Sequence, residues 1–260
     1  MIKALFFDID GTLVSFKTHR IPVSTVEALL AAKDRGTKIF ISTGRAFPLI
    51  NNIDTIVPLV DGYITTNGAH SFTHDGFEQF TPINRHDATV VTEYLLKTGT
   101  PCMVVGRNDI IFPNLNRQLE RQFEEMFDLH FQWSDKPLDE LTRQGILQFT
   151  PIIDNAEEAR LMTGLEHCTS SRWCPYFADI TACGVNKGNG MLAICKHIGI
   201  DSSETMAFGD GGNDLPIIKQ AGIGVAMGNA NEAIKPHADY VTTSVDDDGI
   251  ARALAHLGVI

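Results

Sequence analysis

The sequence predicts an α/β protein whose parallel-sheet domain is interrupted by an inserted α+β domain. Two observations support this prediction. Strand-like and helix-like segments alternate over residues 1–83 and again over residues 184–260, which is typical of a parallel sheet with crossover helices. Residues 84–183 instead contain hairpins and neighbouring strands, which indicate an antiparallel sheet. We therefore expect a core domain, 1–83 and 184–260, and an insert, 84–183.

The first core segment begins with an apolar strand, IKALFF, followed by a helix, STVEALLAAKDRG. In this helix Ser24 and Glu27 form a capping-box pattern, apolar residues recur at helical spacing, and Gly36 supplies the C-terminal stop. Strands are expected in TKIFIST and GYITT, and a second helix is expected to start near Arg45 to Pro48.

The chain then enters the insert through a hairpin, SFTHDGFEQF, with Asp75 and Gly76 at its turn. The elements expected in the insert are a helix in HDATVVTEYLLKTG, a hairpin in PCMVVGRNDIIF, a helix in LNRQLERQFEEMF, a strand in GILQFTPII, a helix in NAEEARLMTGL, and strands in EHCTSSRW and YFADITACG. After Val185 the alternation resumes with a helix in KGNGMLAICKHIG, a strand in ETMAFGD, a helix in NDLPIIKQAG, a strand in IGVAMG, a helix in NEAIKPHA, a strand in DYVTT and a helix in DDGIARALAHLG.

Composition and charge exclude several classes of protein. The formal net charge is −11 and no run of Lys and Arg exists, which argues against nucleic-acid binding. No stretch approaches 18 apolar residues and no secretory leader is recognisable, so we expect a cytoplasmic protein without membrane partners. The cysteines are odd in number and lack metal-ligand spacing, so we expect reduced thiols at Cys102, Cys168, Cys174, Cys183 and Cys195. The expected partner is a small molecule, and the expected state is a monomer or weak homo-oligomer.

Side chains that can carry chemistry follow several of the predicted strands. Asp8 and Asp10 follow the first strand, with Ile9 between them. Because function collects at the carboxyl ends of strands in open α/β sheets, these residues should share one edge of the sheet with others. The others are Ser42, Thr43, Gly44 and Arg45 after the second strand, Asp210, Asn213 and Asp214 in GDGGND, and Lys187 at the start of the helix after the insert.

Such a group of carboxylates needs a cation. Two of them about 4 Å apart repel by roughly 4 kcal/mol at an effective dielectric of about 20. Oxygen ligands without His or Cys select a hard cation, and few carboxylates with room for waters suit Mg²⁺. An EF-hand is excluded because DIDGTLVSFKTH has the wrong acid spacing and no Glu at its end. A metal with open positions, a lysine and a turn with backbone donors suit a phosphate group.

Each feature alone also has a purely structural interpretation. Asp followed by Gly is an ordinary turn sequence, Thr43 with Gly44 is typical of a turn or helix cap, and a single Lys187 is typical of a solvated surface. The joint placement of these residues after successive strands favours function.

The same residues resemble the motifs of a known family. DIDGT at 8–12, ISTGR at 41–45, Lys187 in GVNKG and GDGGND at 209–214 are similar to the four motifs of the haloacid dehalogenase (HAD) superfamily of phosphotransferases. TNGA at 66–69, AMGNA at 226–230 and ADYVT at 238–242 resemble its Cof-type branch. The resemblance covers nearly all of the chain. It implies a Rossmann-like core with a large inserted α+β (type C2) cap, a Mg²⁺ cofactor and a sugar phosphate substrate.

The resemblance also implies a role for each site residue. Asp8 would be the nucleophile that forms an aspartyl phosphate, and Asp10 the general acid and then the base. Mg²⁺ would be bound by Asp8, Asp210 and the backbone carbonyl of Asp10. The phosphate would be bound by Asp8, Ile9, Thr43, Gly44, Lys187 and Asn213, while Asp214 would orient Lys187 or a metal-bound water.

The expected function is therefore a Mg²⁺-dependent phosphatase for small phosphate monoesters, most of all hexose phosphates. Two alternatives stay open. A phosphomutase would need a strong set of arginines in the insert, whose arginines lie mostly on apparent helix or turn surfaces. A non-catalytic phosphate-ligand sensor would need no general acid. In the last strand of the insert Asp179 and Thr181 share one face with Phe177 and Cys183, so a role in substrate binding and a structural role are equally compatible with the pattern.

Overall fold

The computed structural model describes residues 1–127 and 133–260, and the chain forms two compact units. The core domain comprises Met1–Gln79 and Asn186–Ile260, and the cap domain comprises Phe80–Val185. The parallel core and the α+β cap confirm the predicted fold class. The sequence-based boundaries after residues 83 and 183 differ from these by four and two residues.

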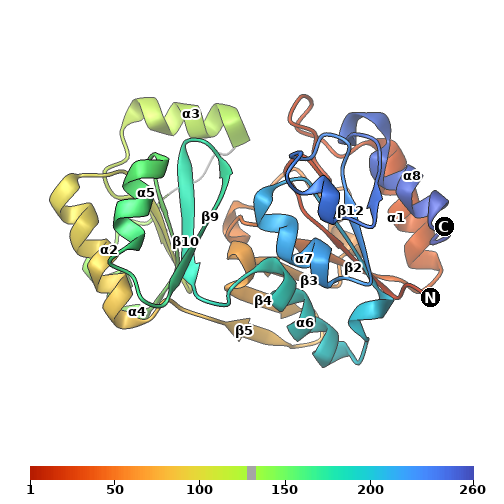
Figure 1. Ribbon diagram of the computed structural model, residues 1–260, viewed down its shortest axis with the longest axis horizontal. Helices are drawn as coiled ribbons and strands as arrows, with labels where there is room; N and C mark the ends of the chain where they lie inside the picture. Colours follow the sequence, from red (N-terminus) through yellow and green to blue (C-terminus); the bar gives the residue numbers. More distant parts are fainter. Residues whose placement is uncertain (128–132) are drawn as a thin grey trace. The chain divides into compact units, whose positions relative to one another are not determined.

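The core domain, all of whose residues are described, contains an eight-stranded sheet in the order β13-β12-β11-β1-β2-β3-β4-β5 (Figure 1). The strands from β13 to β3 are parallel, and β4 runs antiparallel to β3. Their bounds are Ala4–Phe7 (β1), Lys38–Ser42 (β2), Gly62–Thr65 (β3), His70–Thr73 (β4), Glu78–Phe80 (β5), Thr205–Gly209 (β11), Ile223–Ala226 (β12) and Tyr240–Val241 (β13).

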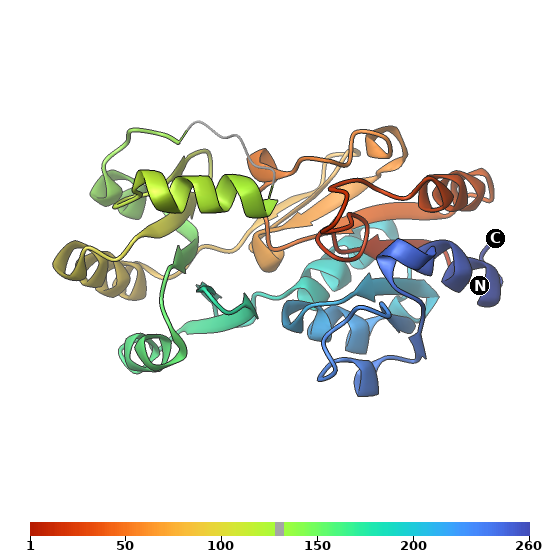
Figure 2. The same cartoon turned by 90° about the horizontal axis from the view of Figure 1, so that it is seen from above.

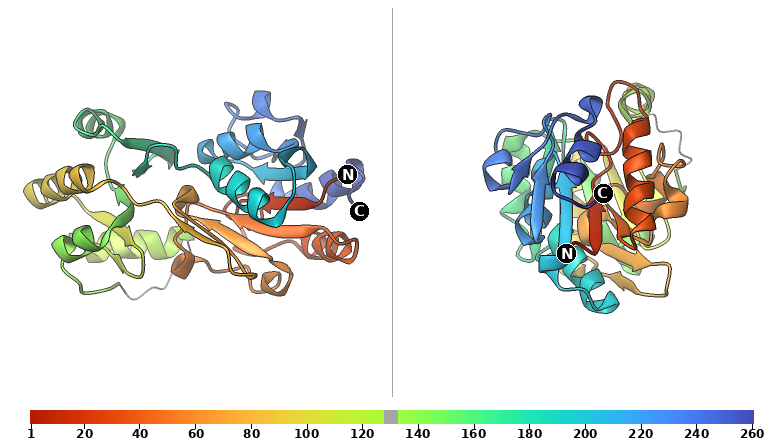
Figure 3. Two further views of the ribbon diagram at one scale, coloured as in Figure 1. Left: turned by 90° about the horizontal axis from the view of Figure 1, so that it is seen from below. Right: turned by 90° about the vertical axis from the view of Figure 1, so that its right-hand side faces the viewer.

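Helices cover both faces of this sheet, as the end-on view in Figure 3 shows. The helices are α1 (Val23–Asp34) and α8 (Gly249–His256) on one face, and α6 (Lys187–Ile198) and α7 (Leu215–Gln220) on the other. In β1, Leu5 and Phe7 pack toward the first pair of helices, and Ala4 and Phe6 toward the second. Burial on both faces explains why β1 is continuously apolar, and each large side chain contributes about 1.5–3 kcal/mol. The central position of β1 places Asp8 in the middle of the carboxyl edge.

One helix-cap prediction and two helix predictions in the core domain are wrong. The capping box at Ser24 does not form, because α1 has Pro22 as its N-cap and the Ser24 hydroxyl donates to Asp248 instead, at 2.5 Å. The helix expected near Arg45 is a single 3₁₀ turn, Phe47–Leu49, and the chain soon adopts a positive φ at Asn52. The helix expected in NEAIKPHA is a 3₁₀ turn at 235–237, since its central proline has no amide hydrogen to continue a helix.

The described part of the cap domain contains a five-stranded sheet in the order β7-β6-β8-β10-β9, antiparallel throughout. The strands are Cys102–Gly106 (β6), Ile110–Ile111 (β7), Ile146–Pro151 (β8), Cys168–Cys174 (β9) and Phe177–Ala182 (β10). The cap helices, seen from above in Figure 2, are Arg85–Thr98 (α2), Arg117–Phe127 (α3), Leu138–Gln144 (α4) and Asn155–Met162 (α5). Helix α4 is not predicted by the sequence, because seven residues are too few to show a helical period.

Two expectations from composition can be compared with the structure. Over residues 1–127 and 133–260, no helix is long and apolar enough to cross a membrane. Cys102, Cys168, Cys183 and Cys195 are free thiols, and the side chain of Cys174 lies outside the described set.

Candidate active site

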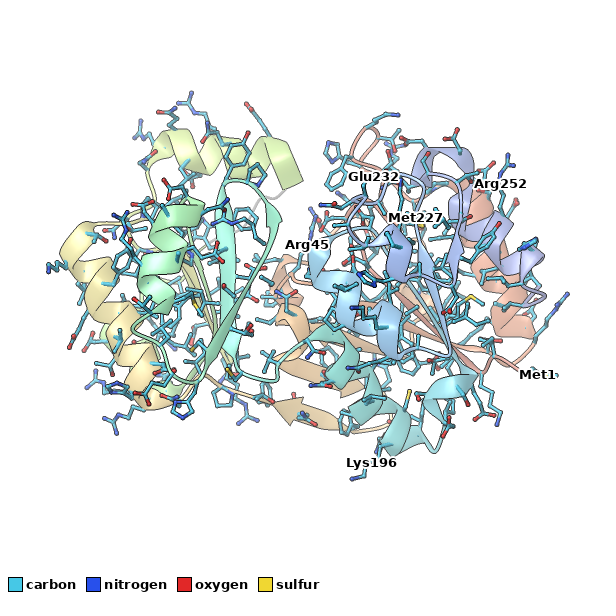
Figure 4. All side chains as sticks on the ribbon, viewed as in Figure 1. Met1, Arg45, Lys196, Met227, Glu232 and Arg252 are labelled. Atoms are coloured by element: carbon cyan, nitrogen blue, oxygen red, sulfur yellow. The ribbon has the colours of Figure 1, made fainter. Side chains whose placement is uncertain are left out.

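The predicted site residues meet at the carboxyl edge of the core sheet. Asp8 follows β1, which lies between β2 and β11. Thr43 follows β2, and Asp210 follows β11. The three strands are parallel neighbours, so their ends share one edge, where Arg45 is labelled in Figure 4. The order of the strands in the sheet therefore explains how residues from distant parts of the sequence come together.

Lys187 provides the central positive charge of the site. As the first residue of α6 it is completely buried, and its Nζ donates to Asp8 Oδ1 at 2.6 Å and to Asp214 Oδ1 at 2.5 Å. Burial alone would lower the pKa of Lys187, but the carboxylates of Asp214 and Asp8 outweigh burial and raise it above its ordinary value. Lys187 therefore stays protonated and holds Asp8 in place.

Burial and the neighbouring acids disfavour the ionised forms of Asp8 and Asp210. Burial raises the pKa of Asp8 to about 7, with Asp214 and Asp10 adding to the shift and Lys187 opposing it. Burial also raises the pKa of Asp210 well above its ordinary value, helped by the charges of Asp8 and Asp214. A further cation at this place would favour the ionised form of both carboxyl groups.

The arrangement of oxygen atoms fits such a cation. Carboxylate oxygens of Asp8, Asp210 and Asp214 lie within 4.8 Å of one another. Asp214 is already engaged, since its Oδ2 accepts the amides of Asp210 at 3.0 Å and Gly211 at 2.9 Å while Oδ1 accepts from Lys187. Asp8 and Asp210 are therefore the better ligands. A purely oxygen donor set of this kind suits a hard divalent ion such as Mg²⁺.

The loop after β1 is built to approach Asp210 closely. Gly11 has a positive φ of 81°, and a side chain there would overlap the Asp210 carboxylate. Thr12 Oγ1 donates to Asp210 Oδ1 at 2.9 Å, so the loop and the end of β11 are directly linked. Asn229, in the loop after β12, donates to the carbonyl of Gly11 at 2.8 Å and fixes the loop from the other side.

Asp10 lies beside Arg45 rather than beside Lys187. Arg45 Nε donates to Asp10 Oδ2 at 2.8 Å, and Nη2 donates to Asp10 Oδ1 at 2.6 Å. The two carboxylates of DIDGT are thus held by different cations from different elements. This separation allows Asp8 and Asp10 to perform different tasks.

Thr43, Gly44 and Asn213 line a second part of the edge together with Asn67. Thr43 Oγ1 accepts the amide of Arg45 at 3.1 Å. Asn213 Nδ2 donates to Asn67 Oδ1 at 3.0 Å, and a side chain on Gly44 would come within 3.1 Å of that Asn67 oxygen. Glycine at 44 therefore lets the backbone approach these two amides.

Comparison with known proteins identifies the family. A sequence profile of the haloacid dehalogenase-like hydrolases matches residues 5–254. The chain belongs to this family. The resemblance predicted from the four motifs is therefore confirmed, and this HAD-like hydrolase is a phosphoric monoester hydrolase.

Similar proteins cover all or nearly all of the hydrolase. A structure described as the HAD subclass IIB sugar phosphatase BT4131 is 43% identical, with a TM-score of 0.93, and the match covers 99% of this chain and 100% of that one. The phosphatase BT1666 from Bacteroides thetaiotaomicron is 35% identical, with a TM-score of 0.88, over 100% of this chain and 96% of its own. The 5-amino-6-(5-phospho-D-ribitylamino)uracil phosphatase YcsE of Bacillus subtilis is 29% identical over 98% and 95% of the two chains.

Sequence reasoning did not assign a role to Arg45, Asn67 or Asn229 in this hydrolase. Each has a weak signal in the sequence, because each follows a predicted strand in a motif that resembles the family. Thr66 and Asn67 both have a positive φ, of 53° and 54°, which is uncommon for a β-branched residue such as Thr66. Backbone strain of this kind costs about 1–3 kcal/mol and clusters at functional sites.

Asp179 and Thr181 are both buried in the cap domain. The Asp179 carboxylate accepts hydrogen bonds from Gln148 Nε2 at 3.0 Å and from Thr150 Oγ1 at 2.8 Å. These contacts hold β10 against β8, so Asp179 has at least a structural role in the cap sheet.

Proposed function

We propose that this hydrolase is a Mg²⁺-dependent phosphatase that cleaves sugar phosphates through an aspartyl-phosphate intermediate. The observation that supports the proposal most strongly is the buried contact of Lys187 with Asp8, next to Asp210, whose pKa burial and the neighbouring acids raise well above its ordinary value. The substrate class is supported by a sugar phosphatase with 43% sequence identity over nearly the whole chain.

In this proposal Asp8 attacks phosphorus and Lys187 bonds with the phosphoryl oxygens as negative charge spreads over them. Thr43, the backbone amides of Ile9 and Gly44, and Asn213 are proposed to bind the remaining phosphoryl oxygens. The support is their position at the same edge as Asp8, with Gly44 close to the amide pair of Asn67 and Asn213.

The cation would be held by Asp8, Asp210 and the backbone carbonyl of Asp10. When bound, Mg²⁺ would neutralise the carboxylates and bind a phosphate oxygen. Asp214 would take no part in the chemistry itself, since it orients Lys187 and holds the backbone after β11 through the amides of Asp210 and Gly211.

Asp10 is proposed to protonate the departing alcohol and then to take a proton from the attacking water. Its carboxylate is held by Arg45 while Asp8 is held by Lys187, which supports separate tasks for the two acids.

We also propose a cytoplasmic protein that acts on a free small molecule. The free thiols at Cys102 and Cys195 and the net charge of −11 support this setting, since the charge disfavours nucleic acid as a partner. A monomer or weak homo-oligomer stays a prediction.

The alternatives have less support. A phosphomutase would need a set of cap arginines available to a second phosphate, and two of the cap arginines are engaged in ion pairs, Arg172 with Glu158 at 2.8 Å and Arg143 with Asp139 at 3.1 Å. A binding protein would not need an acid held apart from the nucleophile as Asp10 is.

A substrate panel tests the proposal. With Mg²⁺, the purified protein should release inorganic phosphate from at least one sugar phosphate, Asp8→Asn should abolish release, and Asp139→Asn in the cap should not change it. No release from any member of the panel would overturn the phosphatase proposal. Conversion of glucose 1-phosphate to glucose 6-phosphate without phosphate release would support the mutase instead.

A further inference from the structure

We propose that Arg45 is the positioning residue for Asp10, an inference that rests on the proposed function. Arg45 binds both oxygens of the Asp10 carboxylate, through Nε at 2.8 Å and Nη2 at 2.6 Å. Both side chains are mostly buried, with 10% of Arg45 and 14% of Asp10 exposed. A guanidinium that makes two parallel hydrogen bonds fixes the distance, the plane and the rotation of a carboxylate, which a single contact does not do.

Arg45 is itself held by the chain that follows it. Its Nη1 donates to the carbonyl of Leu49 at 3.1 Å and also to Asn51 Oδ1. The 3₁₀ turn Phe47–Leu49 ends at the first of these acceptors and is soon followed by the second, so it returns the chain to the arginine. The guanidinium thus contacts Asp10 on one side and this turn segment on the other. The direction of the Asp10 carboxylate is therefore set by the backbone after β2.

Positioning matters in both steps of the reaction. In the first step an Asp8 oxygen bonds to phosphorus, the bond from phosphorus to the alcohol oxygen breaks, and Asp10 gives its proton to that oxygen. In the second step water attacks phosphorus and gives a proton to Asp10, while the bond from phosphorus to Asp8 breaks and inorganic phosphate leaves.

The test compares two leaving groups, because a positioning residue for a general acid matters only where the leaving group needs a proton. The best sugar phosphate of the panel releases an alcohol, which departs poorly without a proton. p-Nitrophenyl phosphate releases an acidic phenol, which departs without help. The measured quantity is kcat/KM, which covers the steps up to departure of the leaving group, so the second step does not obscure it.

For Arg45→Ala we expect kcat/KM to fall about 10- to 100-fold with the sugar phosphate, which is part of the total of about 10²–10⁴-fold that general acid catalysis contributes. With p-nitrophenyl phosphate we expect kcat/KM to fall less than about 3-fold, because its leaving group needs no proton. Asp10→Asn should show the same contrast with a larger loss. Arg45→Lys should recover part of the rate, because an ammonium group makes one contact where guanidinium makes two. Asn51→Ala should also lower kcat/KM more with the sugar phosphate than with p-nitrophenyl phosphate, but by less than Arg45→Ala does. It removes one contact of Arg45 without removing the arginine.

The controls separate this role from a structural one. Arg143→Ala removes an exposed arginine that pairs with Asp139 in the cap and should leave both rates unchanged. If Arg45→Ala does not fold, as judged by thermal melting, Arg45→Lys and Asn51→Ala still test the proposal. Equal losses with the two substrates would overturn the positioning role while leaving the phosphatase proposal intact. A wild-type protein that hydrolyses neither substrate would overturn both.

Discussion

Replacement of Lys187 by methionine should strongly destabilise the core domain. The lysine is completely buried, and its Nζ contacts Asp8 at 2.6 Å and Asp214 at 2.5 Å. Methionine keeps the unbranched apolar stem but leaves two buried carboxylates without their cation. Removing one partner of a buried ion pair costs about 3–5 kcal/mol. We expect a loss of this size in the free energy of unfolding at about pH 8 without Mg²⁺.

The loss should be smaller at about pH 5.5. Burial, with Asp214 and Asp10, raises the pKa of Asp8 to about 7 although Lys187 opposes the shift. Without Lys187 this pKa rises further, so Asp8 is protonated at the lower pH and no longer repels Asp214. The lysine itself does not titrate in this range, because its pKa is raised above its ordinary value of 10.5.

Urea unfolding at both pH values, in the presence of a chelator, measures this effect. The matched control is Lys33→Met, which breaks the pair of Lys33 with Asp61 at 2.5 Å, where the side chains are 33% and 23% exposed. Such a pair contributes about 0–1 kcal/mol. The reasoning is refuted if, at both pH values, Lys187→Met lowers the free energy of unfolding no more than Lys33→Met does.

Three further predictions concern the metal and the cap. In the metal-free protein, the free energy of unfolding should rise as pH falls from about 8 to about 5, because the raised pKa of Asp8 lets the folded state bind more protons than the unfolded chain. Urea unfolding measures this pH dependence, and saturating Mg²⁺ should remove it. A free energy of unfolding that falls over this range in the metal-free protein would contradict the prediction. Asp210→Asn should weaken Mg²⁺ binding at least about tenfold in titration calorimetry, and unchanged affinity would remove Asp210 from the ligands. Burial alone would raise the pKa of Asp87, but hydrogen bonds from the His167 amide and the Cys168 thiol lower it. Asp87→Asn should therefore lower the free energy of unfolding by about 1–3 kcal/mol at neutral pH, and this loss should disappear as pH falls below the ordinary Asp pKa of 3.8. A loss that persists at that pH in urea unfolding would contradict the role of the Asp87 carboxylate.

Several features of the hydrolase follow from local patterns in the sequence. The continuous apolar run of β1 indicates a strand buried on both faces, and the structure places it at the centre of the sheet. Parallel neighbours end at one edge, so the positions of Asp8, Thr43 and Asp210 after strands were enough to predict that they meet. The inserted cap was also predictable from local patterns. Its hairpins and neighbouring strands differ from the alternating strands and helices of the core domain.

Other features depend on which side chains face one another across the fold. Nothing local indicates that Arg45 turns toward Asp10, because that contact joins the loops after two neighbouring strands. The same is true of Asn67, whose left-handed backbone brings it to Asn213. The start of α1 at Val23 also depends on distant residues, since the Ser24 hydroxyl that would cap the helix donates to Asp248 instead.

The sequence by itself thus determined the fold class, the edge of the sheet at which the site lies and the acids and lysine that form it, because strand order and burial are encoded in local hydrophobic patterns. Only the tertiary structure decided which cation holds which acid. Lys187 holds Asp8 and Arg45 holds Asp10, and these pairings arise from side-chain directions that the folded backbone imposes.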